Sequence, residues 1–171
     1  KKHTHAIVEM GSNYPGEIGG LCKICEPDFG IITSIGNAHL EFFKSLENIF
    51  LEKKSLFDHI YASKSTKKGF VFCNDDHWLS KLDRFNYVKT FGVNKGDFII
   101  VYGENYIEIK NRKDKFILKN DKLVGRHNFI NLVNAFIMSI TLFPEEALGL
   151  EKIANRFCSQ LNRSQWIKKE K

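Results

Sequence analysis

The sequence has few cysteines, and their spacing excludes the sites that cysteines most often build. Of the four cysteines, Cys22 and Cys25 form a C-x-x-C pair, whereas Cys73 and Cys158 are single and distant. A structural zinc site would need a second pair of ligands, and a disulfide framework would need regularly paired cysteines. We therefore expect structural cysteines in a reducing compartment.

Long apolar runs are also absent. The longest apolar stretch is interrupted well before the length that crosses a membrane, and the first residues show no signal-peptide pattern. The sequence contains no internal repeat and no low-complexity linker. These absences predict a cytoplasmic protein without membrane insertion.

Apolar residues are abundant enough for one folded domain. The 171 residues are 43% hydrophobic and 13% aromatic, which is enough to bury a core. The formal charge is +6, and many lysines fall in expected turns and strand ends, among them Lys67, Lys68, Lys110, Lys113, Lys115, Lys119 and Lys122. Because no basic motif is interleaved with aromatics, we expect a solvated basic surface and no nucleic-acid partner.

Short apolar strands alternate with helical segments in the first half of the chain. Strands are expected at 6–10, 30–35 and 70–74, and helices at 15–25, 46–62 and 78–82. This rhythm predicts an α/β fold with a mostly parallel sheet flanked by helices. Four further strands, split by turn residues, predict an added small antiparallel meander; they fall at 88–92, 97–103, 105–111 and 115–120, before helices at 127–142 and 145–158.

Ligand-type side chains follow the strand expected at 30–35. Gly36 closes the apolar run, and Asn37, His39 and Glu41 come directly after it. A parallel sheet meets its ligands at the carboxyl ends of its strands. The sequence therefore predicts a binding site at this point.

A lysine interrupts the apolar face of the helix expected at 46–62. On a helical wheel Lys53 falls in the middle of this face and Lys54 at its edge; the face comprises Leu46, Ile49, Phe50, Leu56, Phe57 and Ile60. A lysine in this position snorkels, pairs with an anion or loses its charge. This pattern is compatible both with a lysine that snorkels to the solvent and with a neutral, reactive amine.

Two amides share one side of the helix expected at 127–142. Asn128 and Asn131 lie near its start, opposite Phe129, Val133 and Phe136, and Gly125 precedes it. Such amides either cap the helix or read the edge of a base. Capping alone would explain one of them.

Three strings, in this order and at these separations, resemble the Mur ligase family. They are VEMGSNYPGEIGGL, IGNAHLEFFKSLENIFLEKKSLF and GRHNFINLVNAF, and they span nearly the whole chain. The family comprises ATP-dependent amide-forming enzymes of peptidoglycan precursor synthesis, with a central domain that is similar to P-loop NTPases. Within the family, the first string and AHLE look most like the branch that adds D-alanyl-D-alanine to UDP-N-acetylmuramoyl-tripeptide.

The resemblance implies two magnesium sites. Glu9, expected at the end of its strand, matches the family's acidic magnesium ligand, and His39 matches the histidine at the second magnesium. Lys53 matches the lysine that the family carbamylates, which turns an amine into a carboxylate for that second site. Carboxylate oxygens suit magnesium, whereas an ammonium group would repel it.

The resemblance also implies an ATP site and a substrate loop. Asn128 and Asn131 match the adenine-reading asparagines, beside His127, and Arg163 resembles the arginine that meets the nucleotide phosphates. With Lys53 and His39, Arg163 is a predicted catalytic residue. By the same resemblance, Asn13 and Tyr14 lie where the substrate-facing loop begins.

The chain departs from the family at one large feature. The phosphate-cradling G-x-x-G-K-[ST] string does not occur. We therefore expect residues 1–160 to be the later part of the central ATP-binding domain, truncated on the phosphate-loop side, and 161–171 to lead into the hinge before a C-terminal domain. The N- and C-terminal domains of the same protein would be its partners, and this chain alone is expected to be inactive.

Smaller departures lie in the substrate loop. Phe42 stands where the family usually has glycine after HLE, and Tyr14 where histidine is common. Two other assignments stay open. One is another ligase of the family, of the tripeptide-forming or folylpolyglutamate type, and the other is a non-catalytic nucleotide-binding scaffold.

Overall fold

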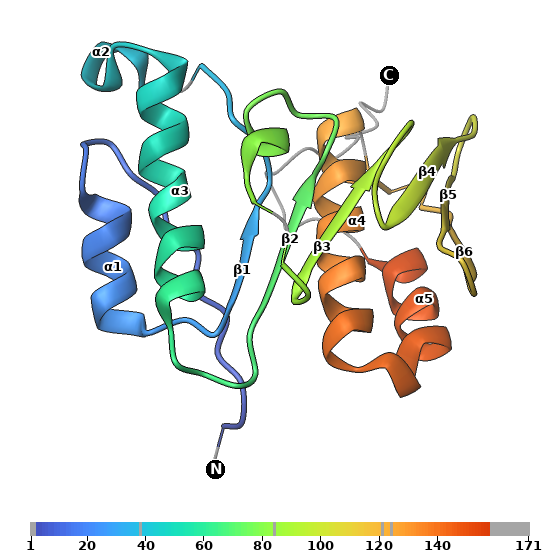
Figure 1. The fold of residues 1–171 in the computed structure, drawn as a ribbon. Helices are drawn as coiled ribbons and strands as arrows, with labels where there is room; N and C mark the ends of the chain where they lie inside the picture. Colours follow the sequence, from blue (N-terminus) through green and yellow to red (C-terminus); the bar gives the residue numbers. More distant parts are fainter. Residues whose placement is uncertain (1–2, 38, 84, 121, 124, 158–171) are drawn as a thin grey trace, which may run out of the picture.

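A six-stranded mixed sheet forms the centre of the protein (Figure 1). The computed structural model describes residues 3–157 except 38, 84, 121 and 124. The strands lie side by side in chain order, and β1 to β4 are parallel while β4 to β6 are antiparallel. Their bounds are β1 Phe29–Ile32, β2 Gly69–Cys73, β3 Val88–Gly92, β4 Phe98–Tyr102, β5 Ile107–Lys110 and β6 Lys115–Leu118.

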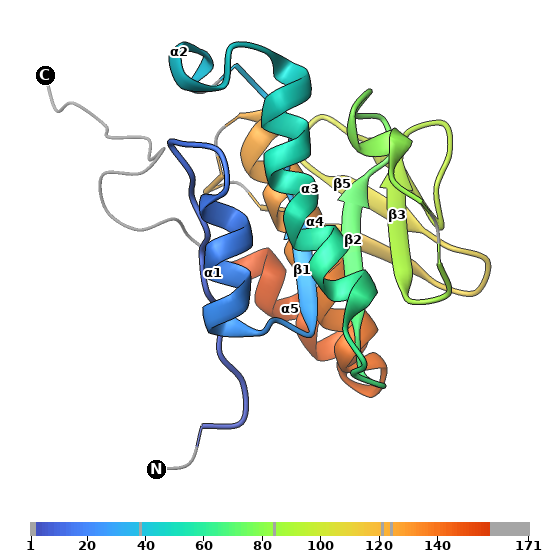
Figure 2. The same ribbon diagram turned by 60° about the vertical axis from the view of Figure 1, so that its left-hand side comes forward.

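Helices cover both faces of the sheet, with α1 and α3 on one side and α4 and α5 on the other (Figures 1 and 2). The first group comprises α1 Glu17–Cys25, α2 Leu40–Phe43 and α3 Leu46–Ala62. The second comprises α4 Arg126–Leu142 and α5 Ala147–Arg156, and the 3-10 turns are η1 Leu79–Lys81 and η2 Pro144–Glu146. The predicted α/β class, with a mostly parallel sheet between helices, is confirmed.

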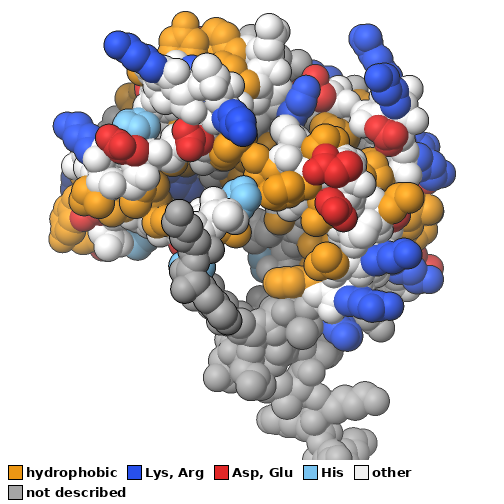
Figure 3. Space-filling model, turned by 90° about the horizontal axis from the view of Figure 1, so that it is seen from below, with side chains coloured by type: hydrophobic (Ala, Val, Ile, Leu, Met, Phe, Trp, Pro, Cys, Tyr) orange, Lys and Arg blue, Asp and Glu red, His pale blue; other side chains and the backbone are white. Residues whose placement is uncertain are grey.

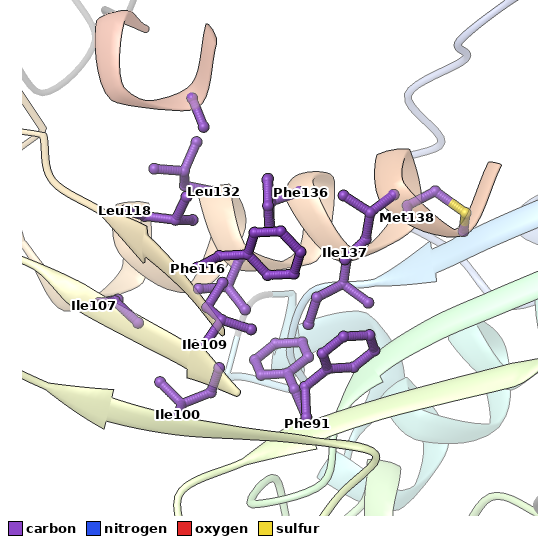
Figure 4. Close-up of a cluster of buried hydrophobic side chains, with 14 of the residues drawn as sticks. Phe91, Ile100, Ile107, Ile109, Phe116, Leu118, Leu132, Phe136, Ile137 and Met138 are labelled. Atoms are coloured by element: carbon purple, nitrogen blue, oxygen red, sulfur yellow. The ribbon is translucent and has the colours of Figure 1, made fainter. Parts of the chain in front are cut away.

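Strand β2 shows why the sheet needs helices on both sides. Phe70 and Phe72 pack toward α3, whereas Val71 belongs to the cluster beneath α4. All three side chains are almost completely buried. A strand buried on both faces is a continuous apolar run, as in the sequence GFVFC. The cluster between the sheet and α4 also receives residues of β3 to β6 (Figure 4).

The strand predicted at 6–10 does not form. Residues 5–12 have no regular secondary structure, and the side chain of Ile7 is fully exposed. None of the six described strands pairs with this segment, and a strand needs a hydrogen-bonded neighbour to form. An apolar pentapeptide alone does not determine a strand.

The prediction that the strand at 88–92, β3, belongs to the antiparallel meander is wrong. Strand β3 pairs in parallel with both β2 and β4, so the meander comprises β4 to β6 only. The Asp97 carboxylate accepts hydrogen bonds from the backbone N–H and the hydroxyl of Thr90, at 2.8 and 3.0 Å. These bonds fasten the start of β4 beside β3 and let the chain re-enter the sheet in the same direction.

In the described part of the chain, no single helix is long and apolar enough to cross a membrane. Helix α4 and the segment from Pro144 to Arg156 reach the required length and hydropathy only when they are taken together, and they are bent by 120° at their junction. The apolar side of α4 packs in the core of the protein. On the face seen in Figure 3, Lys and Arg side chains lie among acidic and hydrophobic ones.

Candidate functional site

The candidate site lies where the parallel strands end. Because β1 to β4 run in the same direction, their carboxyl ends share one edge of the sheet, the upper edge of β1 to β3 in Figure 1. The segments that follow β1 and β2 carry the polar groups of this edge. This is the part of an α/β sheet where ligands bind.

Asp76 joins the segments that follow β1 and β2. Its Oδ2 accepts a hydrogen bond from the backbone N–H of Ile35 at 3.0 Å. Its Oδ1 accepts from the N–H groups of Trp78 and Leu79, at 2.9 and 3.1 Å. Sequence reasoning missed Asp76, although it follows a predicted strand in the same way that His39 does.

Lys53 reaches this edge from α3. Its Nζ donates a hydrogen bond to the carbonyl oxygen of Ser34 at 2.8 Å. Burial lowers the pKa of Lys53, and the nearby charge of Asp76 opposes that shift. Lys54, by contrast, forms an ion pair with Asp58 one turn along the helix. Both lysines are partly buried, and they differ in their partners.

The loop of Asn13 and Tyr14 lies beside the segment of His39. Oε2 of Glu17 accepts hydrogen bonds from the N–H groups of Asn13 and Tyr14, at 2.6 and 3.1 Å. The bonds from Tyr14 and Asn13 lower the pKa of Glu17, and the charge of His39 adds to this effect. The rings of Tyr14 and Phe42 are in contact, with centroids 4.6 Å apart. The structure thus brings together the predicted substrate loop and the predicted ligand segment.

A buried carboxylate that sequence reasoning missed holds the start of α1. Glu52 is 5% exposed, and its two oxygens accept hydrogen bonds from the N–H groups of Gly16 and Ile18, at 2.7 and 2.8 Å. The free N–H groups of a helix start favour a carboxylate there. On the helical wheel, α3 has one apolar face, which packs toward the sheet. Helix α1 covers another side of α3, and Glu52 is buried on that side.

The predicted metal ligands Glu9 and His39 both lie at the surface. Glu9 is exposed within the irregular segment 5–12, and His39 is exposed just before α2. Among the residues that the structure describes, no three His, Cys, Asp or Glu side chains lie close enough together to hold a metal. The donor types still fit magnesium, because Glu9 and the Ser34 carbonyl offer oxygen and carbamylation would add oxygen at Lys53. The assignment of these ligands stays a prediction.

The start of α4 presents the predicted nucleotide-reading residues. Gly125 precedes the helix with a φ of 87° and provides no side-chain cap; Asn128 is partly buried, and His127 and Asn131 are exposed. Beside this turn the Arg126 guanidinium lies 4.8 Å from the ring centre of Tyr102. A pocket of about 500 Å³ opens here, lined by Val93, Tyr102, Gly103, Glu104, Tyr106, Ile107, Arg126 and Phe129. Arg163 lies outside the described residues.

Comparison with known proteins identifies the family. The Mur ligase middle domain matches residues 1–139. The UDP-N-acetylmuramoyl-tripeptide--D-alanyl-D-alanine ligase of Borreliella burgdorferi is 40% identical over 83% of this chain and 31% of its own length. The UDP-N-acetylmuramoylalanine--D-glutamate ligase of Prochlorococcus marinus is 32% identical over 92% of this chain and 32% of its own length.

A solved structure of a relative has a similar fold. The MurF ligase from Thermotoga maritima in complex with ADP superposes with a TM-score of 0.63 and 28% identity, over 77% of this chain and 31% of that protein. The chain spans about a third of the length of the curated relatives it matches. On the match of its first 139 residues and the likeness of its fold, the chain belongs to the Mur ligase family.

Proposed function

We propose that this chain is the later part of the central ATP-binding domain of an enzyme that joins D-alanyl-D-alanine to UDP-N-acetylmuramoyl-tripeptide. In the proposed reaction ATP phosphorylates the peptide carboxylate, and the amine of the dipeptide then attacks the acyl phosphate and releases phosphate. The observation that carries the proposal is the Lys53 amine, which is partly buried and bonded to the Ser34 carbonyl at the carboxyl edge of the sheet. The Borreliella burgdorferi relative supports this choice of substrates.

The proposed role of Lys53 follows from its surroundings. Because burial lowers its pKa, a larger share of Lys53 is uncharged at a given pH than of a solvated lysine. An uncharged amine adds to carbon dioxide, forming an N–C bond and releasing a proton, and so becomes a carbamate. The product places a carboxylate on a long arm beside the loop of Ser34.

Magnesium binding is proposed for Glu9, His39 and carbamylated Lys53, in two sites. Bound magnesium would screen the negative charges of the phosphates and the peptide carboxylate as they approach. The contribution of the chain itself is positional. Asp76 holds Ile35 in place, and Glu17 holds Asn13 and Tyr14, the residues proposed to face the peptide substrate.

The nucleotide is proposed to bind at the start of α4. There His127, Asn128 and Asn131 would contact the adenosine, and Arg163 the phosphates. An amide offers both a donor and an acceptor, which suits the edge of adenine. The ADP complex of the Thermotoga maritima relative supports a nucleotide as the ligand, and the pocket beside Arg126 and Tyr102 leaves space next to this helix start.

A second candidate is a ligase of the same family that uses a different acceptor. The Prochlorococcus marinus D-glutamate ligase matches 92% of this chain at 32% identity, which favours this alternative over an unrelated activity. In either case the 171-residue chain by itself is expected to release no phosphate from ATP, because it contains no G-x-x-G-K-[ST] string. Turnover by the isolated chain would contradict this.

The test is phosphate release by the full-length protein with ATP, magnesium and UDP-N-acetylmuramoyl-tripeptide. Release should depend on D-alanyl-D-alanine and should fall at least about 100-fold in Lys53→Ala, on the scale of losing a positioned catalytic group. Lys54→Ala is the matched control and should keep its activity. Release that follows a single amino acid would favour the second candidate, and no release with any acceptor would favour a scaffold.

A further inference from the structure

The segment of His39 is held in an unfavourable conformation. Helix α2 has only four residues, and the residues before and after it, His39 and Lys44, have left-handed φ values of 60° and 66°. Residues other than glycine rarely adopt this backbone conformation, because Cβ comes too close to the backbone. Such a turn persists only where surrounding contacts hold it.

Contacts hold this turn from two sides. On the inner side Phe43 is 3% exposed, and its carbonyl oxygen accepts a hydrogen bond from Nδ2 of Asn48 at 2.6 Å. On the outer side Phe42 packs against Tyr14, with ring planes inclined by 57°. Both of these rings remain partly exposed, so their contact lies at the surface, next to the candidate site.

Tyr14 is itself firmly anchored. Its backbone N–H is bonded to Glu17, and two residues further along, the N–H of Gly16 is bonded to the buried carboxylate of Glu52. The backbone around Tyr14 is therefore hydrogen-bonded to α1 and α3. The ring of Phe42 packs against this fixed segment. The family departures at positions 14 and 42 thus meet in space.

We propose that the contact of Tyr14 with Phe42 is an aromatic clasp that fixes the turn from His39 to Lys44, and that both aromatics are positioning residues for His39. The clasp stands on the geometry alone. Its use for catalysis rests on the proposed function, in which His39 binds magnesium. Loss of either ring would free the outer side of the turn and let His39 leave its left-handed conformation.

Amide hydrogen exchange of residues 39–44 tests the clasp in Tyr14→Leu, Phe42→Leu and the double variant. Exchange should accelerate about 2- to 10-fold in each single variant, the range expected for one aromatic pair, and no further in the double variant. The matched control is Tyr61→Leu. Tyr61 is 51% exposed, and its ring centroid lies 4.4 Å from that of Phe85, elsewhere on the surface. Unchanged exchange in both single variants, or equal acceleration in the control, would overturn the clasp.

Magnesium dependence of the full-length protein tests the positioning role. The half-saturating magnesium concentration should rise several-fold in Phe42→Leu, whereas Tyr61→Leu, the matched control, should leave it unchanged. Faster exchange with unchanged magnesium dependence would overturn the positioning role. An inactive wild-type enzyme would instead refute the proposed function and with it that role, while the exchange result would still decide the clasp.

Discussion

The core beneath α4 and the loops around α1 and α2 are held by different forces. Beneath α4, apolar side chains such as Ile109 and Ile137 are completely buried (Figure 4). Before and at the start of α1, the carboxylates of Glu17 and Glu52 accept hydrogen bonds from backbone N–H groups. Tight packing therefore supports the scaffold. Carboxylate hydrogen bonds hold the loop of Asn13 and Tyr14, and an aromatic contact and an amide hydrogen bond hold the turn that follows His39.

The largest expected effect is the difference in stability loss between Ile109→Ala, in the core beneath α4, and Ile7→Ala, in the irregular segment before α1. Ile109→Ala removes a side chain that is 0% exposed and should lower the free energy of unfolding by about 2–5 kcal/mol. Ile7→Ala, at a side chain that is 101% exposed, should change it by less than about 0.5 kcal/mol. Urea unfolding of the two variants measures both. Similar losses would show that the segment 5–12 is packed after all.

A smaller effect is expected at the buried carboxylate of the loops. Glu52→Gln places an amide donor against the N–H of Gly16 or Ile18, and one unsatisfied buried group costs about 1–3 kcal/mol. Urea unfolding should show this loss, together with faster amide exchange in residues 13–18. Glu47→Gln, at an exposed position of the same helix, is the control. A neutral Glu52→Gln would mean that the carboxylate does not hold α1.

The smallest effect is a pH response confined to the loops. The backbone bonds lower the pKa of Glu17 below its usual 4.5. A lowered carboxyl pKa means that its stabilisation is complete above about 4.5 and is lost as pH falls through the lowered value. The amide signals of Asn13 and Tyr14 in NMR should shift over that window and stay unchanged there in Glu17→Gln. A shift that persists in the variant would assign the response to another group.

Much of the scaffold could be predicted because its signals are local. The apolar period of α3 gave the helix at its observed bounds, Leu46–Ala62, and also distinguished Lys53 from Lys54. The apolar run at 70–74 similarly predicted a strand, and β2 is observed one residue earlier, at Gly69–Cys73. In each case one element's own pattern carries the information.

Features that depend on a second element could not be read from one segment. The apolar residues 6–10 predicted a strand, but a strand requires a paired neighbour. Strand β3 pairs in parallel with β2 and β4, and its contacts with them, such as the bond of Asp97 to Thr90, join separate segments. Glu52 is buried only because α1 packs on α3, so its role is invisible on the wheel of α3 alone.

The most direct test of the central claim is ¹³C NMR of the full-length protein in ¹³C-labelled bicarbonate. We expect one carbamate signal that is absent in Lys53→Ala and retained in Lys54→Ala, because burial lowers the pKa of Lys53 at the carboxyl edge of the sheet. A signal that persists in Lys53→Ala, or no carbamate signal in the active wild-type enzyme, would contradict the assignment of Lys53 as the functional amine.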